Sequence, residues 1–158
     1  MQFYRECNVQ DIPSMWEINE QGLPGTGKVS VEQMGELLQL SDLCIGAYID
    51  GKLVGFVLCL YPKKDYSSQN YAWFNERYNQ FIYVDRIAIS TQHRDKKIGS
   101  ELYERVFQLA TKKQIPITAE VSLRPPNEGS DRFHLRHGFS SVGEFHQSGK
   151  SVTMYIRE

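Results

Sequence analysis

The stretch that decides the fold is Phe81–Ser100, with the sequence FIYVDRIAISTQHRDKKIGS. Its first part, Phe81–Ile89, is an apolar run that only one charged pair interrupts, which is typical of a central β-strand. Apolar residues then recur at helical spacing from Ile98 onward, which predicts a helix from about Lys97 to Lys112. A strand that leads through a short turn into a long helix is a building unit of α/β domains.

The turn before this helix, Arg94–Ser100 with the sequence RDKKIGS, is a candidate anion site. The first turn of a helix has unpaired N–H groups and the positive end of the helix dipole, so it favours a phosphate. Arg94, Lys96 and Lys97 add positive charge, and Gly99 lets a ligand approach the backbone. On its own the segment fits a solvated basic turn better, since a single basic turn of this kind is common.

Strands and helices alternate on both sides of this unit. Pro62–Gln80 shows neither period and is rich in aromatic residues, so we expect a loop or a short helix that either borders a binding surface or folds onto the core. The order of elements predicts an α/β domain with a mixed sheet. The other predicted elements are strand Phe3–Cys7, a helix from Asp11 to near Gly22, a helix over Ser30–Leu40, hairpin strands Cys44–Ile49 and Leu53–Leu60 around Asp50-Gly51, strand Ile115–Leu123, a helix capped by Ser130 that runs to Arg136, and strands Phe139–Phe145 and Val152–Ile156.

Length and charge limit the classes of function. With 158 residues, of which 41% are hydrophobic, the chain suits one domain over residues 1–158. The 18 Lys and Arg against 19 Asp and Glu argue against electrostatic binding to nucleic acid or to a membrane surface. Cys7, Cys44 and Cys59 lack metal-ligand spacing and fit a reducing compartment. No signal peptide or apolar span of ~18 residues is evident, so we expect a cytoplasmic protein without a metal.

The turn and the second half of the chain together resemble the GNAT acetyltransferase superfamily. The acyl-CoA motif of that family is Arg or Gln, two residues, Gly, one residue, then Gly or Ala, between the fourth strand and the third helix. Here it reads Arg94-x-x-Lys97-x-Gly99, with Lys97 in the usual place of Gly. VDRIAIS resembles the fourth strand, VSLRPPN the fifth, and SDRFHLRHGFSSVGE the second conserved segment. The resemblance implies a mostly antiparallel mixed sheet of about six to seven strands flanked by about four helices.

The resemblance also implies an N-acetyltransferase that uses acetyl-CoA as acyl donor and a small-molecule or peptide amine as acceptor, by direct attack in a ternary complex. It implies that the backbone of Ile87 and Ile89 pairs with the pantetheine arm like an added strand, with Asn127 beside the arm. If Lys97 has a positive φ, the turn is strained by about 1 kcal/mol. The residues implied around the pyrophosphate are Arg94, Lys96, Lys97, Ile98, Gly99 and Ser100.

Two residues are candidates for proton transfer. His134 stands where the family usually has a tyrosine that protonates the departing sulfur, four residues before Gly138. An imidazole with a pKa near ~6.5 can serve in that role, although a buried structural histidine would fit the same position. Asp85 can accept the proton of the amine, or it can form a structural ion pair with Arg86. The N–H of Ile87 is the candidate donor to the oxyanion.

Other interpretations remain open at this point. A non-catalytic acyl-CoA-binding module would keep the fold without the tyrosine. Gly22–Val29, GLPGTGKV, matches part of a phosphate-binding loop, but Val29 replaces the Ser or Thr and the preceding residues have helical spacing. The resemblance implies instead that this segment, between the first two helices, is a loop that helps to shape the acceptor cleft. The exposed closing strand and the aromatic segment would suit a homodimer.

Overall fold

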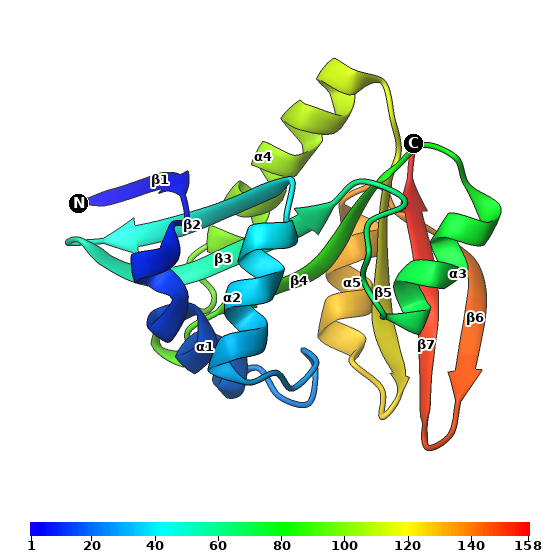
Figure 1. The fold of residues 1–158 in the computed structure, drawn as a ribbon, viewed down its shortest axis with the longest axis horizontal. Coiled ribbons are helices and arrows are strands. Elements are labelled where there is room, and N and C mark those ends of the chain that lie inside the picture. The colour runs from blue at the N-terminus through cyan, green and yellow to red at the C-terminus, as the bar shows by residue number, and fades with distance from the viewer.

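The computed structural model describes residues 1–158, which form one sheet with helices on both faces (Figure 1). The strands are β1 (Gln2–Glu6), β2 (Leu43–Ile49), β3 (Lys52–Leu60), β4 (Ile82–Ile89), β5 (Ile117–Arg124), β6 (Ser140–Gln147) and β7 (Lys150–Arg157). The α-helices are α1 (Ile12–Gln21), α2 (Val31–Leu40), α3 (Gln69–Arg77), α4 (Ile98–Lys113) and α5 (Glu128–Arg136), with short 3-10 turns at Val9–Asp11 and Thr91–His93.

The seven strands lie in the order β1-β2-β3-β4-β5-β7-β6. All neighbours pair antiparallel except β4 and β5, which are parallel and are connected through α4. The hairpin of β2 and β3 turns at Asp50 and Gly51, both with positive φ, as the Asp-Gly pair predicts. The fold class expected from the sequence is confirmed, with five α-helices instead of about four.

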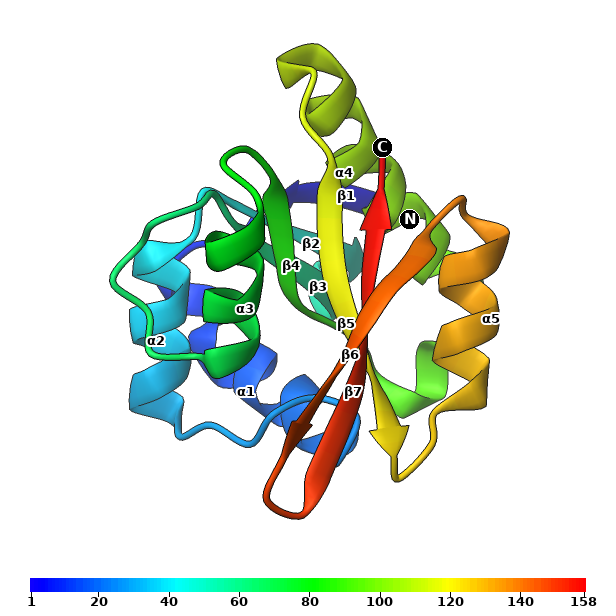
Figure 2. The ribbon, with the colours of Figure 1, turned by 90° about the vertical axis from the view of Figure 1, so that its right-hand side faces the viewer.

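The helices lie on both sides of the sheet (Figure 2), and their apolar residues pack against it. On one side α4 contributes Leu102 to the largest cluster of buried residues, and α5 lies beside it. On the other side Met34 of α2 packs with Phe56 of β3, and Phe74 of α3 packs with Tyr83 of β4. No helix is both long and apolar enough to cross a lipid bilayer.

The structure decides one alternative that the sequence left open and corrects one predicted helix cap. Pro62–Gln80 contains the helix α3, whose N-cap Ser68 accepts a hydrogen bond from the N–H of Tyr71, and Phe74 folds onto the core. The helix α5 begins at Glu128 and is capped by Asn127, not by Ser130 as predicted from the sequence. The reason is local, because the Asn127 side chain accepts the N–H of Ser130 at 3.2 Å and so satisfies the first turn.

Candidate active site

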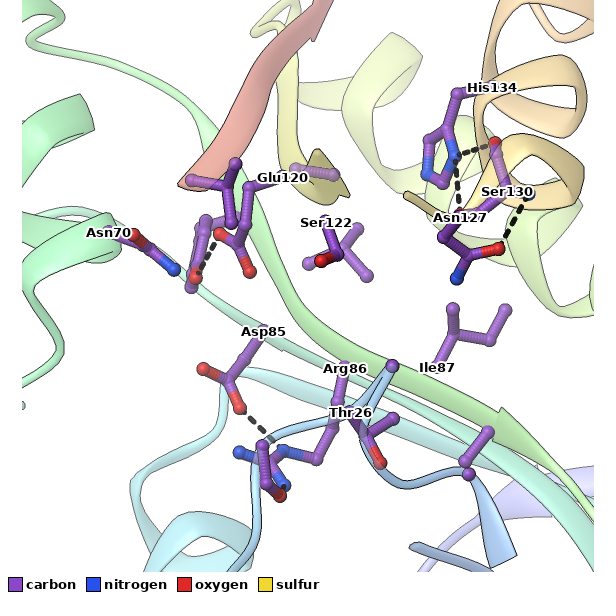
Figure 3. A pocket seen from close by; sticks show the side chains of 18 of the residues that line it. Thr26, Asn70, Asp85, Arg86, Ile87, Glu120, Ser122, Asn127, Ser130 and His134 are labelled. Carbon is purple, nitrogen blue, oxygen red and sulfur yellow. Dashed lines mark hydrogen bonds and ion pairs between the residues drawn. The ribbon is translucent and has the colours of Figure 1, made fainter. Parts of the chain in front are cut away.

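The parallel strands β4 and β5 separate soon after they begin. They pair only at Ile82 with Ile117 and at Tyr83 with Thr118, and further along they diverge (Figure 1). A bulge at Asp85 marks the separation, since the β3 register passes from Val84 directly to Arg86. A cavity of about 570 Å³ occupies the region between the two strands (Figure 3). The fold therefore leaves one edge of β4 open to a ligand.

The backbone of β4 presents hydrogen-bonding groups to this cavity. The N–H of Ser90 donates to the C=O of Val54 at 2.8 Å, so these two residues form a hydrogen-bonded pair of the β3–β4 ladder. Pairs alternate along an antiparallel ladder, and Ile87 and Ile89 therefore turn their N–H and C=O groups away from β3. Both residues line the cavity, and the C=O of Ile89 already accepts a bond from Arg94 Nε at 3.2 Å. An extended chain could pair with this edge as an added strand.

The basic turn leads from the end of β4 to the N-terminus of α4 and borders a second cavity of about 370 Å³. Lys97 is the N-cap of α4 and has a φ of 63°, so the strain considered for this position, about 1 kcal/mol, is present. Lys96 does not line the cavity. Arg136 of α5 does line it, and no local pattern indicated this, because only the packing of α5 brings Arg136 to the turn. The lining residues are Ile89, His93, Arg94, Asp95, Lys97, Ile98, Gly99, Ser100, Phe133 and Arg136.

Asp85 is engaged on both oxygens. It accepts a hydrogen bond from the Tyr66 hydroxyl at 2.6 Å. Its other oxygen accepts a hydrogen bond from Arg86 Nε at 2.7 Å (Figure 3). Arg86 is 8% exposed and also donates to Asn19 Oδ1 and to the C=O of Gly27, each at 3.0 Å. The contacts are those of the structural ion pair, and they tie the segment before α3 and the loop between α1 and α2 to the bulge of β4.

Glu120 of β5 is a second carboxyl group in the cavity, and our sequence reasoning missed it. Burial raises the pKa of Glu120 to about 8, although a hydrogen bond from the Tyr83 hydroxyl at 2.6 Å opposes this effect. The side chain points into the cavity between β5 and β4 (Figure 3). The signal was the single acidic residue within the apolar run ITAEVSL. A carboxylate with a pKa near neutrality can exchange protons with a substrate.

His134 of α5 is 4% exposed, and both of its ring nitrogens have hydrogen-bond partners, with Ser130 Oγ as a longer contact of Nδ1 at 3.4 Å. Nδ1 lies 2.8 Å from the C=O of Ser130, which can only accept, so Nδ1 carries a proton. Nε2 lies 2.8 Å from the hydroxyl of Tyr103 on α4. Burial lowers the pKa of His134, so the imidazole is neutral and its Nε2 accepts the phenolic hydrogen. The proton shared by this pair therefore belongs to Tyr103, a residue that sequence reasoning did not select.

Asn127 lies where the loop between α1 and α2 approaches α5. Its Oδ1 caps the helix, and its Nδ2 would lie 3.5 Å from a Cβ placed on Gly25. Because Gly22–Lys28 follows the helix α1 and no strand, the segment lacks the context of a phosphate-binding loop. It forms one wall of the first cavity through Gly25, Thr26 and Gly27.

The cysteines and potential metal ligands lie outside this arrangement. Cys44 and Cys59 are buried, Cys7 is half-buried, and none of them lines the two cavities. No group of three or more His, Cys, Asp or Glu side chains is arranged to hold a metal ion. The side chains of the first cavity that can carry or accept a proton include Asp85, Glu120 and the Tyr103–His134 pair, beside the open edge of β4.

Comparisons with known proteins agree with this fold. The model of the acetyltransferase (GNAT) family matches residues 12–139. The ribosomal-protein-S18-alanine N-acetyltransferase from Escherichia coli has a similar structure, with a TM-score of 0.76 and 13% identity over 99% of this chain and 93% of that chain. An N-acetyltransferase from Staphylococcus aureus Mu50 has a TM-score of 0.76 and 16% identity over 100% of this chain and 98% of that chain. A chain of the NatC complex bound to Gag peptide and CoA has a TM-score of 0.76 and 13% identity over 99% of this chain and 97% of that chain. No curated protein matches the chain.

Proposed function

Since this chain belongs to the acetyltransferase (GNAT) family, we propose that it is an N-acetyltransferase that moves the acetyl group of acetyl-CoA to a primary amine by direct attack in a ternary complex. The observation that carries the proposal is the open edge of β4 at Ile87 and Ile89, which ends at the basic N-terminus of α4. Among the structural neighbours, the NatC complex is described as bound to CoA.

In this proposal the two cavities hold the two ends of acetyl-CoA. The backbone groups of Ile87 and Ile89 bind the pantetheine arm, with Asn127 beside it, and the N–H of Ile87 donates to the oxyanion. When bound, acetyl-CoA supplies an activated thioester to the amine. Lys96 belongs to the same turn but does not line the second cavity, whereas Arg136 of α5 does. The residues proposed to bind the pyrophosphate are therefore Arg94, Lys97, Ile98, Gly99, Ser100 and Arg136.

We assign the acceptance of the amine proton to Glu120. Asp85 was the candidate from the sequence, but both of its oxygens are occupied by Tyr66 and Arg86. Glu120 accepts one hydrogen bond from a side chain, that of Tyr83. Its pKa of about 8 is close to neutral pH, which suits a general base. The ion pair of Asp85 then positions the walls of the acceptor site and is not itself the base.

The proton for the leaving sulfur comes from the Tyr103–His134 pair. The neutral imidazole has its only N–H on the side of Ser130, so it cannot donate from Nε2. The Tyr103 hydroxyl carries the available proton, and His134 positions it. After transfer, the phenolate recovers a proton from solvent, while the proton that Glu120 took from the amine returns to solvent.

The proposed function predicts binding of acetyl-CoA and amine-dependent release of CoA. Calorimetry with acetyl-CoA tests the first, and a thiol reagent with a panel of amines tests the second. Arg94→Glu should weaken binding at least about tenfold, because it replaces a charge-assisted contact to phosphate by repulsion. Absence of acetyl-CoA binding would refute the proposal. Binding without transfer to any amine would instead identify the non-catalytic acyl-CoA-binding module.

The proton donor is tested with variants of the hydrogen-bonded pair. Tyr103→Phe should lower kcat at least about tenfold with little change in acetyl-CoA affinity. His134→Gln, which keeps an acceptor for the hydroxyl, should retain more activity than His134→Phe. Tyr155→Phe is the control, since that phenol stacks on His134 but donates to Asp131. Full activity of Tyr103→Phe with loss in His134→Gln would return the role of acid to His134.

A further inference from the structure

The end of the first cavity near Asp85 and Glu120, where the acceptor amine would bind, is bordered by segments that are far apart in the sequence. Gly27 is tied to β4 through Arg86, and Tyr66 is tied to the same bulge through Asp85. The hairpin of β6 and β7 is tied to α3, where Gln147 Nε2 donates to Asn70 Oδ1 at 3.3 Å. These walls leave a recess that suits a small molecule better than an extended polypeptide.

The hairpin is also fixed by close packing. A Cβ on Gly143 would lie 3.0 Å from Trp73 Cζ2, so the backbone of β6 rests directly on the α3 indole. A register shift of β6 between Ser141 and Gly143 occurs at the same place. The hairpin is therefore held as a wall of the cavity, and its first β7 residue, Lys150, is one of the lining residues.

Lys150 lies on the same face of the sheet as Glu120. In the β5–β7 ladder Glu120 pairs with Met154 and Ser122 with Val152, so the alternation of side chains continues to Lys150. The positive charge of Lys150 also lowers the pKa of Glu120 against the larger effect of burial. Four residues of strand, ~13 Å, separate Met154 from Lys150, so the two charged side chains approach the recess from different positions along it.

The balance of charge at this end of the cavity is positive. Asp85 is neutralised by Arg86 at 2.7 Å, and Glu120 is mostly protonated at neutral pH because its pKa is about 8. Lys150 forms no ion pair with any carboxylate of the chain. Lys150 is an exposed residue at the rim of the recess. A cation at this rim favours an anionic group on the ligand and disfavours a second ammonium.

From these bordering walls and the unpaired charge of Lys150 we propose that the acceptor is a small primary amine that carries a carboxylate, with the amine directed to Glu120 and the carboxylate bound by Lys150. The inference rests on the proposed function and adds the class of acceptor to it. A polyamine would place positive charge against Lys150, and a protein N-terminus would have to pass the tied walls.

The test measures kcat/KM for matched pairs of amines with the intact protein. The pairs are 6-aminohexanoate with 6-aminohexanamide and leucine with leucinamide, and spermidine and a tripeptide amide complete the panel. We expect at least one carboxylate to exceed its carboxamide by about tenfold, the effect of one charge-assisted contact. Lys150→Glu should abolish or invert this preference. Lys52→Glu, an equal change of charge on the exposed hairpin of β2 and β3, should preserve it.

Acetyl-CoA affinity, measured in the same variants, separates the two levels of inference. If wild type does not bind acetyl-CoA, the proposed function fails and the acceptor class fails with it. If wild type binds acetyl-CoA and acetylates spermidine or the tripeptide amide in preference, only the acceptor class is overturned. Equal rates within both pairs, or an equal loss for both members of a pair in Lys150→Glu, would also overturn it.

Discussion

Glu120→Gln is the substitution whose effect can be worked out furthest from the structure. Glutamine has nearly the same shape and keeps an oxygen for the hydroxyl of Tyr83, so packing should be preserved. Burial raises the pKa of Glu120 from 4.5 to about 8. Between these two values the folded state binds more protons than the unfolded state, so the free energy of unfolding falls as pH rises.

The size of the effect follows from the same two values. At about 1.4 kcal/mol for each tenfold change, the difference corresponds to about 5 kcal/mol lost once the pH exceeds 8. Glu120 faces the cavity, where water can solvate the ionised form, so we expect about half of this figure. Glu120→Gln should therefore be more stable than wild type by about 2 to 3 kcal/mol at pH 9 and equal to it near pH 4.

Urea unfolding followed by tryptophan fluorescence at pH 5, 7 and 9 measures this difference, since the chain has 2 tryptophans. Glu36→Gln, which changes an exposed carboxylate on α2, is the control and should show no such trend. The same substitution of Glu120 should remove most of the transferase activity. A difference in stability that stays constant from pH 5 to pH 9 would refute the assigned pKa, and unchanged activity would refute the role as base.

Three further predictions concern the turn before α4, the packing of β6 on α3 and the ionisation of Glu120. Lys97→Gly should raise the free energy of unfolding by about 1 kcal/mol, because glycine removes the strain of the left-handed backbone at the N-cap. An unchanged free energy of unfolding in urea would show that this strain is absent. Gly143→Ala should destabilise by about 1 to 3 kcal/mol through contact with Trp73, whereas Gly129→Ala in the open helix α5 should stabilise by about 0.5 to 1 kcal/mol, both by thermal unfolding. The rate of transfer should rise with pH to a plateau above about 8 as Glu120 ionises, and a profile that falls over pH 6 to 8 would contradict its role.

Much of the fold was predictable because its signals are local. The alternation of apolar and polar residues, the Asp50-Gly51 turn and the apolar run of β4 each depend on neighbours in the chain. The helix α3 and the cap at Asn127 were less clear. The aromatic residues of α3 pack on a core that its own sequence does not reveal, and Asn127 and Ser130 are equally good caps by residue type.

By itself the sequence determined the order of elements, the resemblance to the family and the basic turn at Arg94 and Lys97. Only the tertiary structure decided which polar groups are free to react. It places the carboxylate of Asp85 in an ion pair, leaves that of Glu120 facing the cavity and gives the proton next to His134 to Tyr103. The physical reason is that burial and hydrogen bonding set the protonation of a group, and both depend on partners that are distant in the chain.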